Sequence, residues 1–262
     1  MTFLKQNWFK FSILLLLILC FLYFIFSGEV CNVRGIELRG ELVTYKLEGG
    51  TDQAPADQTS SDDIMGMIEK AESDSDIKAI LLEIDSFGGS PVAAEEIAKA
   101  LKMTTKPTVA QIRERGISAA YWAATGTNII FASSNSDVGS IGVTMSYLQN
   151  IEKNRKEGLE YIGLTSGNFK DTASPDKPIT SEEKKLLQRD LDIIHDNFVK
   201  AVAQSRNIPV DDVKKLADGS TMLGEMALQS KLIDKIGGLF QVKEYLRDLL
   251  GEEPSICWYS SD

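Results

Sequence analysis

Histidine and cysteine are scarce in this chain. Its 262 residues include one histidine, His195, and three cysteines, Cys20, Cys31 and Cys257. A zinc site needs three or four nitrogen, sulfur or carboxylate ligands at short, characteristic spacings, and these scattered residues do not supply them. We therefore expect no metal site, and no motif in the chain indicates a cofactor.

A conventional serine–histidine triad is disfavoured as well. His195 lies between Ile194 and Asp196, in the middle of a long helix predicted for residues 180–205. A surface position is the simplest interpretation of a histidine in that setting. A hydrolase built on this sequence would therefore need a base other than histidine.

Clusters of lysine and arginine are also missing. The formal net charge is −10 and the isoelectric point is about 4.8. A protein that binds nucleic acid needs a basic surface to neutralise phosphates. We therefore exclude nucleic acid as a partner.

One long apolar run lies near the start of the chain. Residues 11–26 carry no charge, Lys5 and Lys10 precede the run, and Glu29 follows it. At about 1.5 Å per residue the run is slightly short for a hydrocarbon core of roughly 30 Å, so a tilted span and a signal-peptide core both fit its length. The small residues of a cleavage site do not follow the run, which favours an uncleaved anchor. Lysines before the run predict a cytoplasmic N-terminus, with the rest of the chain folded outside the cytoplasm.

The sequence predicts three parts: an anchor at residues 1–31, one folded domain at residues 32–250, and a loosely ordered tail at residues 251–262. Cys31 and Cys257 lie near the two ends of the exported part. They could form a disulfide or remain two free thiols, and the sequence does not decide between these states.

Predicted strands and helices alternate through the folded domain. Helices are expected at residues 64–71, 91–101 and 118–125, and strands at 77–84, 107–112, 128–132 and 141–146, with a turn at 85–90. The strands are almost continuously apolar, which is typical of parallel strands covered by helices on both faces. We therefore predict an α/β fold.

Two segments could carry chemistry. Ser118 follows a strand and begins a helix of small residues, so its hydroxyl would lie beside free backbone N–H groups. Gly88 and Gly89 lack side chains, so backbone N–H groups there could approach a ligand oxygen closely. The alternative is structural: a serine that caps a helix and a glycine pair that makes a turn.

The order of these motifs resembles the signal peptide peptidase A family. The glycine pair comes first, the serine on a small-residue helix second, and the segment 139–143 (GSIGV) third. The resemblance extends over about residues 33–238 and includes the segment 166–171 (SGNFKD). In this family a lysine acts as the general base, and the interval from Ser118 matches Lys170.

The resemblance implies a role for each of these residues. Ser118 attacks the peptide carbonyl, Lys170 takes and later returns the proton, and N–H groups near Gly88, Gly89 and Ala119 hold the oxyanion. A lysine that works as a base needs a lowered amine pKa, which an apolar site can provide and a nearby carboxylate would oppose.

Several neighbouring positions depart from the family pattern or qualify it. The base model requires the Asp171 carboxylate to point away from Lys170. Phe87 replaces a proline before the glycine pair, and Ala119-Ala120 replace a glycine pair after the serine. These changes affect the pocket and therefore substrate preference. Tyr121 and Trp122 are expected to be core aromatics.

The family also implies a fold and a biological setting. The fold would be a crotonase-like or Clp-protease-like spiral of ββα units with an N-terminal transmembrane helix. Members form ring-like homo-oligomers at the bacterial cell membrane, share active sites between subunits, and degrade spent signal peptides and other apolar peptides. Two alternatives remain: a crotonase-like acyl-CoA enzyme, and an inactive membrane scaffold of the same fold.

Overall fold

The computed structural model describes residues 31–46 and 57–259. The predicted anchor at residues 11–26 lies outside these ranges. Within them, no helix combines the length and the apolar character that crossing a membrane requires.

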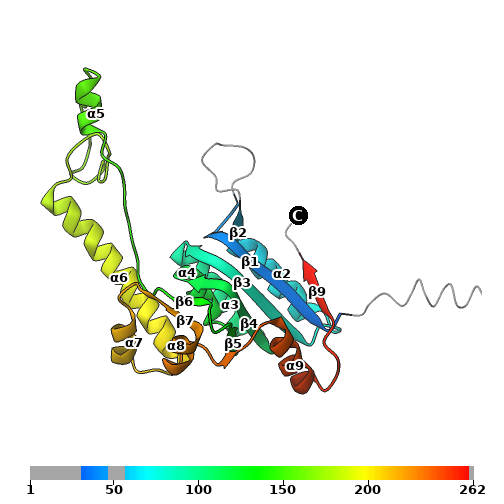
Figure 1. Ribbon diagram of the computed structural model, residues 1–262. Helices are drawn as coiled ribbons and strands as arrows, with labels where there is room; N and C mark the ends of the chain where they lie inside the picture. The colour runs from blue at the N-terminus through cyan, green and yellow to red at the C-terminus, as the bar shows by residue number, and fades with distance from the viewer. Residues whose placement is uncertain (1–30, 47–56, 260–262) are drawn as a thin grey trace, which may run out of the picture.

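Strands and helices alternate along the described chain, so the predicted α/β class is confirmed (Figure 1). The strands are β1 (Val33–Val43), β2 (Gln58–Ser60), β3 (Ala79–Gly89), β4 (Thr108–Ile117), β5 (Ile129–Ala132), β6 (Asp137–Gly139), β7 (Thr221–Leu223), β8 (Lys235–Ile236) and β9 (Ile256–Tyr259). The helices are α2 (Ser61–Ser73), α3 (Pro91–Met103), α4 (Ala119–Ala124), α5 (Ile151–Lys156), α6 (Ser181–Arg206), α7 (Val210–Leu216), α8 (Gly224–Gln229) and α9 (Leu239–Leu250).

The described strands form one sheet in the order β2-β1-β3-β4-β5-β8. Neighbours in this order pair in parallel. Two short strands extend the sheet beside the end of β4: β6 pairs with β4, and β7 pairs antiparallel with β6. The carboxyl ends of β3 and β4 therefore lie next to each other, together with the turns that follow them.

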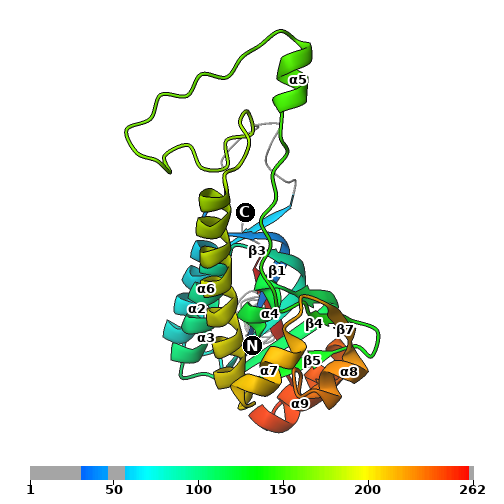
Figure 2. The same ribbon diagram turned by 90° about the vertical axis from the view of Figure 1, so that its left-hand side faces the viewer.

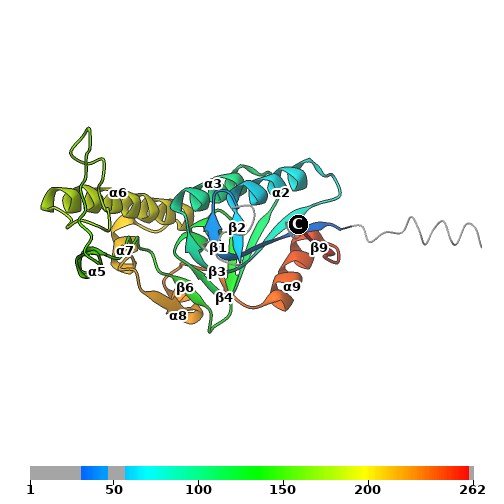
Figure 3. The ribbon, with the colours of Figure 1, turned by 90° about the horizontal axis from the view of Figure 1, so that it is seen from above.

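Helices cover both faces of the sheet (Figure 3). On one face α2, α3 and α4 pack against alternate residues of the central strands, such as Ile80, Leu82 and Ile84 of β3. On the other face α9 packs with Val242 and Leu246 against a smaller apolar cluster. Burial on both faces explains the continuous apolar character of these strands.

The predicted turn at residues 85–90 is wrong, because β3 continues through it to Gly89. Gly88 and Gly89 pair there with Glu41 and Leu42 of β1. At Gly89, where φ is +149°, a Cβ atom would lie 2.2 Å from the carbonyl oxygen of Leu42. The glycine pair therefore permits a close approach of two strands instead of a reversal of the chain.

The predicted strand at residues 141–146 is also wrong, since β6 occupies residues 137–139 and no regular structure follows it before α5. Only Ile141 of this segment is buried. From residue 144 the chain is exposed and leaves the body of the molecule. No neighbouring strand within the described residues pairs with it there.

Residues 145–180, which we call the arm, project from the body (Figures 1 and 2). The arm includes the short helix α5 and leads into the first turns of α6. Many large apolar side chains of the arm are exposed: Met145, Tyr147, Leu148, Leu159, Tyr161, Ile162, Leu164 and Phe169. Thr180 ends the arm and begins α6 with a capping box in which Glu183 is the partner.

A disulfide joins Cys31 and Cys257, which settles the question that the sequence left open. Their Cα atoms are 5.7 Å apart and their separation along the chain is 226 residues. Beside the disulfide, β9 pairs in parallel with β1, beginning with Ile256 opposite Val33. The segment after Leu250, expected to be loosely ordered, therefore contributes a strand to the sheet.

Candidate active site

Ser118 occupies the sharp turn between β4 and α4. Its backbone has φ 54° and ψ −130°, a conformation that non-glycine residues rarely adopt. The turn is held because the Ser118 N–H donates to the carbonyl oxygen of Gly139 at 2.8 Å. The hydroxyl makes no capping hydrogen bond to α4, so the purely structural role as a helix cap is not observed. Such strain is typical of functional residues, whose surroundings stabilise it.

The predicted oxyanion residues surround Ser118. A Cβ atom at Gly88 would lie 2.8 Å from the Ala119 nitrogen and 2.9 Å from the Ser118 Cβ, so the backbone of β3 passes directly beside the serine. The Gly88 N–H donates to the hydroxyl of Ser86 at 3.0 Å. Gly89 and Ala119 both line the cavity beside Ser118. The structure thus brings the serine and all three predicted oxyanion residues together.

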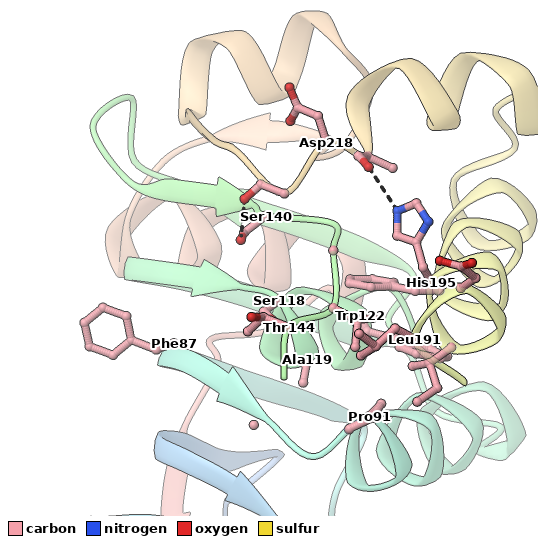
Figure 4. Close-up of a pocket in the computed structure, with 18 of the residues that line it drawn as sticks. Phe87, Pro91, Ser118, Ala119, Trp122, Ser140, Thr144, Leu191, His195 and Asp218 are labelled. Atoms are coloured by element: carbon pink, nitrogen blue, oxygen red, sulfur yellow. Dashed lines mark hydrogen bonds between the residues drawn. The ribbon is translucent and has the colours of Figure 1, made fainter. Parts of the chain in front are cut away.

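A cavity of about 580 Å³ opens beside Ser118 (Figure 4). Its apolar wall includes the stacked rings of Trp122 and Phe198, whose centroids are 4.9 Å apart. Other apolar lining residues are Pro91, Val143, Leu191 and Ile194. The cavity can take an extended apolar side chain next to the serine hydroxyl.

Trp122 and Tyr121 are buried, as predicted for core aromatics. The Tyr121 hydroxyl donates to the carbonyl oxygen of Leu232 at 2.8 Å, and burial raises the pKa of this phenol. The Trp122 ring has two environments, because one part packs in the core while another lines the cavity. Its role in the site was missed because a local sequence pattern does not reveal which edge of a buried ring remains open.

His195 is not the simple surface residue that the sequence suggested. It lies half-buried in the cavity wall, beside Asp218 in Figure 4. Its Nε2 is 3.0 Å from the carbonyl oxygen of Ala217, and a carbonyl only accepts, so Nε2 carries the proton in this contact. This nitrogen is directed away from Ser118. His195 therefore shapes the wall without forming a triad with the serine.

Phe87 lies at the mouth of the cavity, on the opposite side of Ser118 from His195 (Figure 4). Its ring is 65% exposed. The Arg115 guanidinium stacks on it, 4.1 Å from the ring centroid. This cation–π contact holds an exposed aromatic ring beside the cavity.

Lys170 lies in the arm and is exposed, outside the set of described residues that line the cavity. Its backbone N–H donates to the carbonyl oxygen of Gly167 at 3.1 Å, within a turn. One copy of the chain therefore does not bring Ser118 and Lys170 together. The neighbouring Asp171 is 3.1 Å from the amine of Lys177, a residue that sequence reasoning missed.

Comparison with known proteins identifies the family. The model of peptidase family S49 matches residues 100–252, which include Ser118, Lys170 and the whole cavity wall on α6. The chain belongs to peptidase family S49. Among its relatives, a putative signal peptide peptidase SppA of Enterococcus faecium is 33% identical over 69% of this chain and 54% of its own length. The chain is thus a member of the SppA family of serine proteases.

Other relatives are named as proteases, and one solved structure shares the fold. A putative protease of Methanocaldococcus jannaschii is 30% identical over 81% of this chain and 68% of its own length. Protease 4 of Haemophilus influenzae is 26% identical over 89% of this chain and only 37% of its own length. A ClpP1 mutant from Listeria monocytogenes superposes with a TM-score of 0.51 at 13% identity, covering 78% of this chain and 91% of that one. This last likeness concerns the fold, which is Clp-protease-like.

Proposed function

We propose that this protein is a membrane-anchored serine endopeptidase that cleaves apolar peptides, including spent signal peptides, with Ser118 as nucleophile and Lys170 as general base. The observation that carries the proposal is the strained placement of Ser118 beside an apolar cavity, in a chain of family S49.

The proposed reaction is acyl transfer in two steps. The neutral Lys170 amine takes the Ser118 proton as the hydroxyl oxygen attacks the peptide carbonyl, and the resulting ammonium returns the proton to the leaving amine. The amine leaves with one half of the peptide, and Ser118 keeps the other half as an ester. Water, deprotonated by Lys170, then attacks the ester, the acid half of the peptide leaves, and Lys170 returns the proton to the Ser118 oxygen. We assign the oxyanion to backbone N–H groups at Gly89 and Ala119, and Gly88 can join them if its bond to Ser86 opens.

The proposed site is shared between copies of the chain. Ser118 lies in the body, whereas Lys170 lies in an arm that projects away from it. Leu164 is 94% exposed and Ile162 77% exposed on the same arm. Such a gathering of apolar side chains is uncommon on a monomer and favours burial against a partner. A ring of identical subunits, in which the arm of one copy reaches the serine of the next, would cover these residues.

The walls of the cavity support an apolar substrate. Trp122, Leu191 and Phe198 form its interior beside the serine. Polar side chains in the wall, among them His195, Asp192 and Asp218, lie at the end formed by α6 and the segment after α7. Leucine-like side chains of a peptide would pack on Trp122, Leu191 and Phe198 and would displace water from their surfaces.

Two observations support an extracytoplasmic location. The disulfide between Cys31 and Cys257 is typical of oxidising compartments outside the cytoplasm. The lysines that flank the apolar run at residues 11–26 favour a cytoplasmic N-terminus. We therefore place the body on the outer side of a bacterial cell membrane, with a single anchor.

The test is hydrolysis of a fluorogenic peptide with leucine-like side chains by the full-length protein in detergent. We expect Ser118→Ala and Lys170→Ala each to lower kcat/KM by at least about 10³-fold, with the oligomer intact. His195→Ala should change it by less than about threefold, since its Nε2 is bonded to the Ala217 carbonyl oxygen and not to the serine. Full activity of Lys170→Ala would exclude Lys170 as the base.

A fluorophosphonate probe adds a second reading. It should label the wild type and leave Ser118→Ala unlabelled, because it reacts with an activated serine. A wild-type chain that neither reacts with the probe nor cleaves any peptide would instead be the inactive scaffold.

A further inference from the structure

Three charged side chains meet where the arm joins α6. The Lys177 amine is 3.1 Å from a carboxylate oxygen of Asp171 and 2.5 Å from one of Glu183. The side chains of Lys177 and Asp171 are about four-fifths buried, and that of Glu183 is 2% exposed. One amine therefore bridges two carboxylates in a largely desolvated setting.

Glu183 is the fixed member of this group. Its carboxylate accepts the backbone N–H of Thr180 at 2.8 Å, and its own N–H donates to the Thr180 hydroxyl at 3.1 Å. These bonds tie the side chain to the first turn of α6. The hydrogen bond to Glu183 raises the pKa of Lys177, and the same bond lowers the pKa of Glu183, so the pair stays charged.

Asp171 lies outside α6, in the turn that carries Lys170. The Ser174 N–H donates to its backbone carbonyl at 3.0 Å, and the Tyr161 hydroxyl lies 3.5 Å from its carboxylate. Farther out, Asp176 accepts from Asn154 at 2.8 Å. The other charged residues of the hollow beside Lys177 are Arg155 and Glu160.

Asp171 directly follows Lys170, the proposed base, in the sequence. Among the residues that the structure describes, no carboxylate oxygen lies within 4.0 Å of the Lys170 amine. A base amine needs this arrangement, since a nearby anion would stabilise its protonated form. Asp171 would be such an anion if it were not held elsewhere.

We propose that Lys177 is a positioning residue for the reaction: it holds the Asp171 carboxylate against Glu183 and α6, away from the Lys170 amine. The proposal rests on the role of Lys170 as general base. Lys177 touches neither substrate nor Ser118, and it acts through Asp171 alone. Its loss would leave Asp171 free to pair with Lys170.

The simplest variant, Lys177→Met, would also leave the buried Glu183 carboxylate without its cation, which destabilises a fold. The better background is Lys177→Met with Glu183→Gln, because glutamine keeps the capping box and Asp171 is then the one carboxylate of the group left without its cation. Adding Asp171→Asn to this background removes only the carboxylate in question. The two variants therefore differ by one charge.

The measurement is the pH dependence of kcat/KM for the full-length protein in detergent. In the Lys177→Met/Glu183→Gln variant we expect the acid limb to move to higher pH by about one unit, with activity about tenfold lower below the limb. The sign follows because a free Asp171 favours the protonated, inactive amine. The triple variant with Asp171→Asn should return to the wild-type profile.

Controls separate this proposal from the one on which it rests. Lys184→Met removes an exposed lysine from the same turn of α6 and should leave the profile unchanged. Identical acid limbs in the wild type and in the folded Lys177→Met/Glu183→Gln variant would overturn the proposal. Loss of folding in the triple variant would also overturn it, since Lys177 would then be purely structural. Activity in Lys170→Ala would overturn the proposed base itself, whatever the Lys177 variants do.

Discussion

The body and the arm of this protein differ in how many of their contacts form within a single chain. In the body, the turn at Ser118 is hydrogen-bonded, the glycine strand packs beside it, and all residues that line the cavity belong to the body. In the arm, side chains such as Leu148 and Leu164 have almost no cover. The body holds Ser118, the proposed nucleophile, by contacts within one chain, whereas the arm exposes Lys170, the proposed base, and its apolar side chains.

This difference indicates a division of labour. The strained backbone of Ser118 needs a rigid frame, because only a well-packed core can hold a residue in an unfavourable conformation. In the arm, only the junction with α6 needs to be fixed, and the ion pairs of Lys177 with Asp171 and Glu183 hold this junction. The remaining contacts of the arm would form on assembly.

Mixing two inactive variants should have the largest effect and tests whether the body of one copy works with the arm of another. Co-expressed Ser118→Ala and Lys170→Ala chains should recover about a quarter of the wild-type rate, because in random mixing that fraction of sites combines an intact serine with an intact lysine of the neighbour. The measurement is peptide hydrolysis by the co-purified mixture, with each variant alone as the control. A mixture as inactive as its parts would mean that both residues act within one chain.

Weakening the arm should have the next largest effect. Leu164→Ser together with Ile162→Ser should lower the rate per chain by about tenfold at low protein concentration, because the oligomer would lose apolar contacts. The melting temperature of the body should stay the same. Sedimentation and activity over a dilution series measure both effects. Met103→Ser, at an 83% exposed position on α3, is the matched control outside the arm.

The body has its own test, with the smallest effect on catalysis. Cys257→Ser should lower the free energy of unfolding by about 2–4 kcal/mol, because it opens a long covalent loop. Activity below the melting transition should be nearly unchanged, since the disulfide lies at the end of β1 away from Ser118. Thermal unfolding with and without reductant measures the difference. A reductant should destabilise the wild type and leave Cys257→Ser unaffected.

Sequence patterns predicted the parts of the site that depend on local structure. Ser118 is recognisable because a strand leads directly into a helix of small residues, and Gly88-Gly89 because only glycine tolerates that backbone approach. The strand predicted at residues 141–146 failed because a strand also needs a neighbour, and the chain leaves the sheet there.

The rest depends on contacts between distant segments. The helix that contains His195 was predicted, but its packing of Phe198 on Trp122 turns the histidine toward the cavity. Lys177 had a partial signal, because the capping box of Thr180 and Glu183 marks the start of α6. No local pattern links Lys177 to that carboxylate or to Asp171.

The bond between Cys31 and Cys257 also alters the topology of the chain. It closes nearly the whole described chain, the body and the arm together, into one covalent ring. A single backbone cut at any point within that ring opens it without releasing a fragment. An exposed arm is a natural place for such a nick in a preparation of a peptidase. A nicked subunit would therefore keep its full mass on a non-reducing gel and separate into two bands only after reduction.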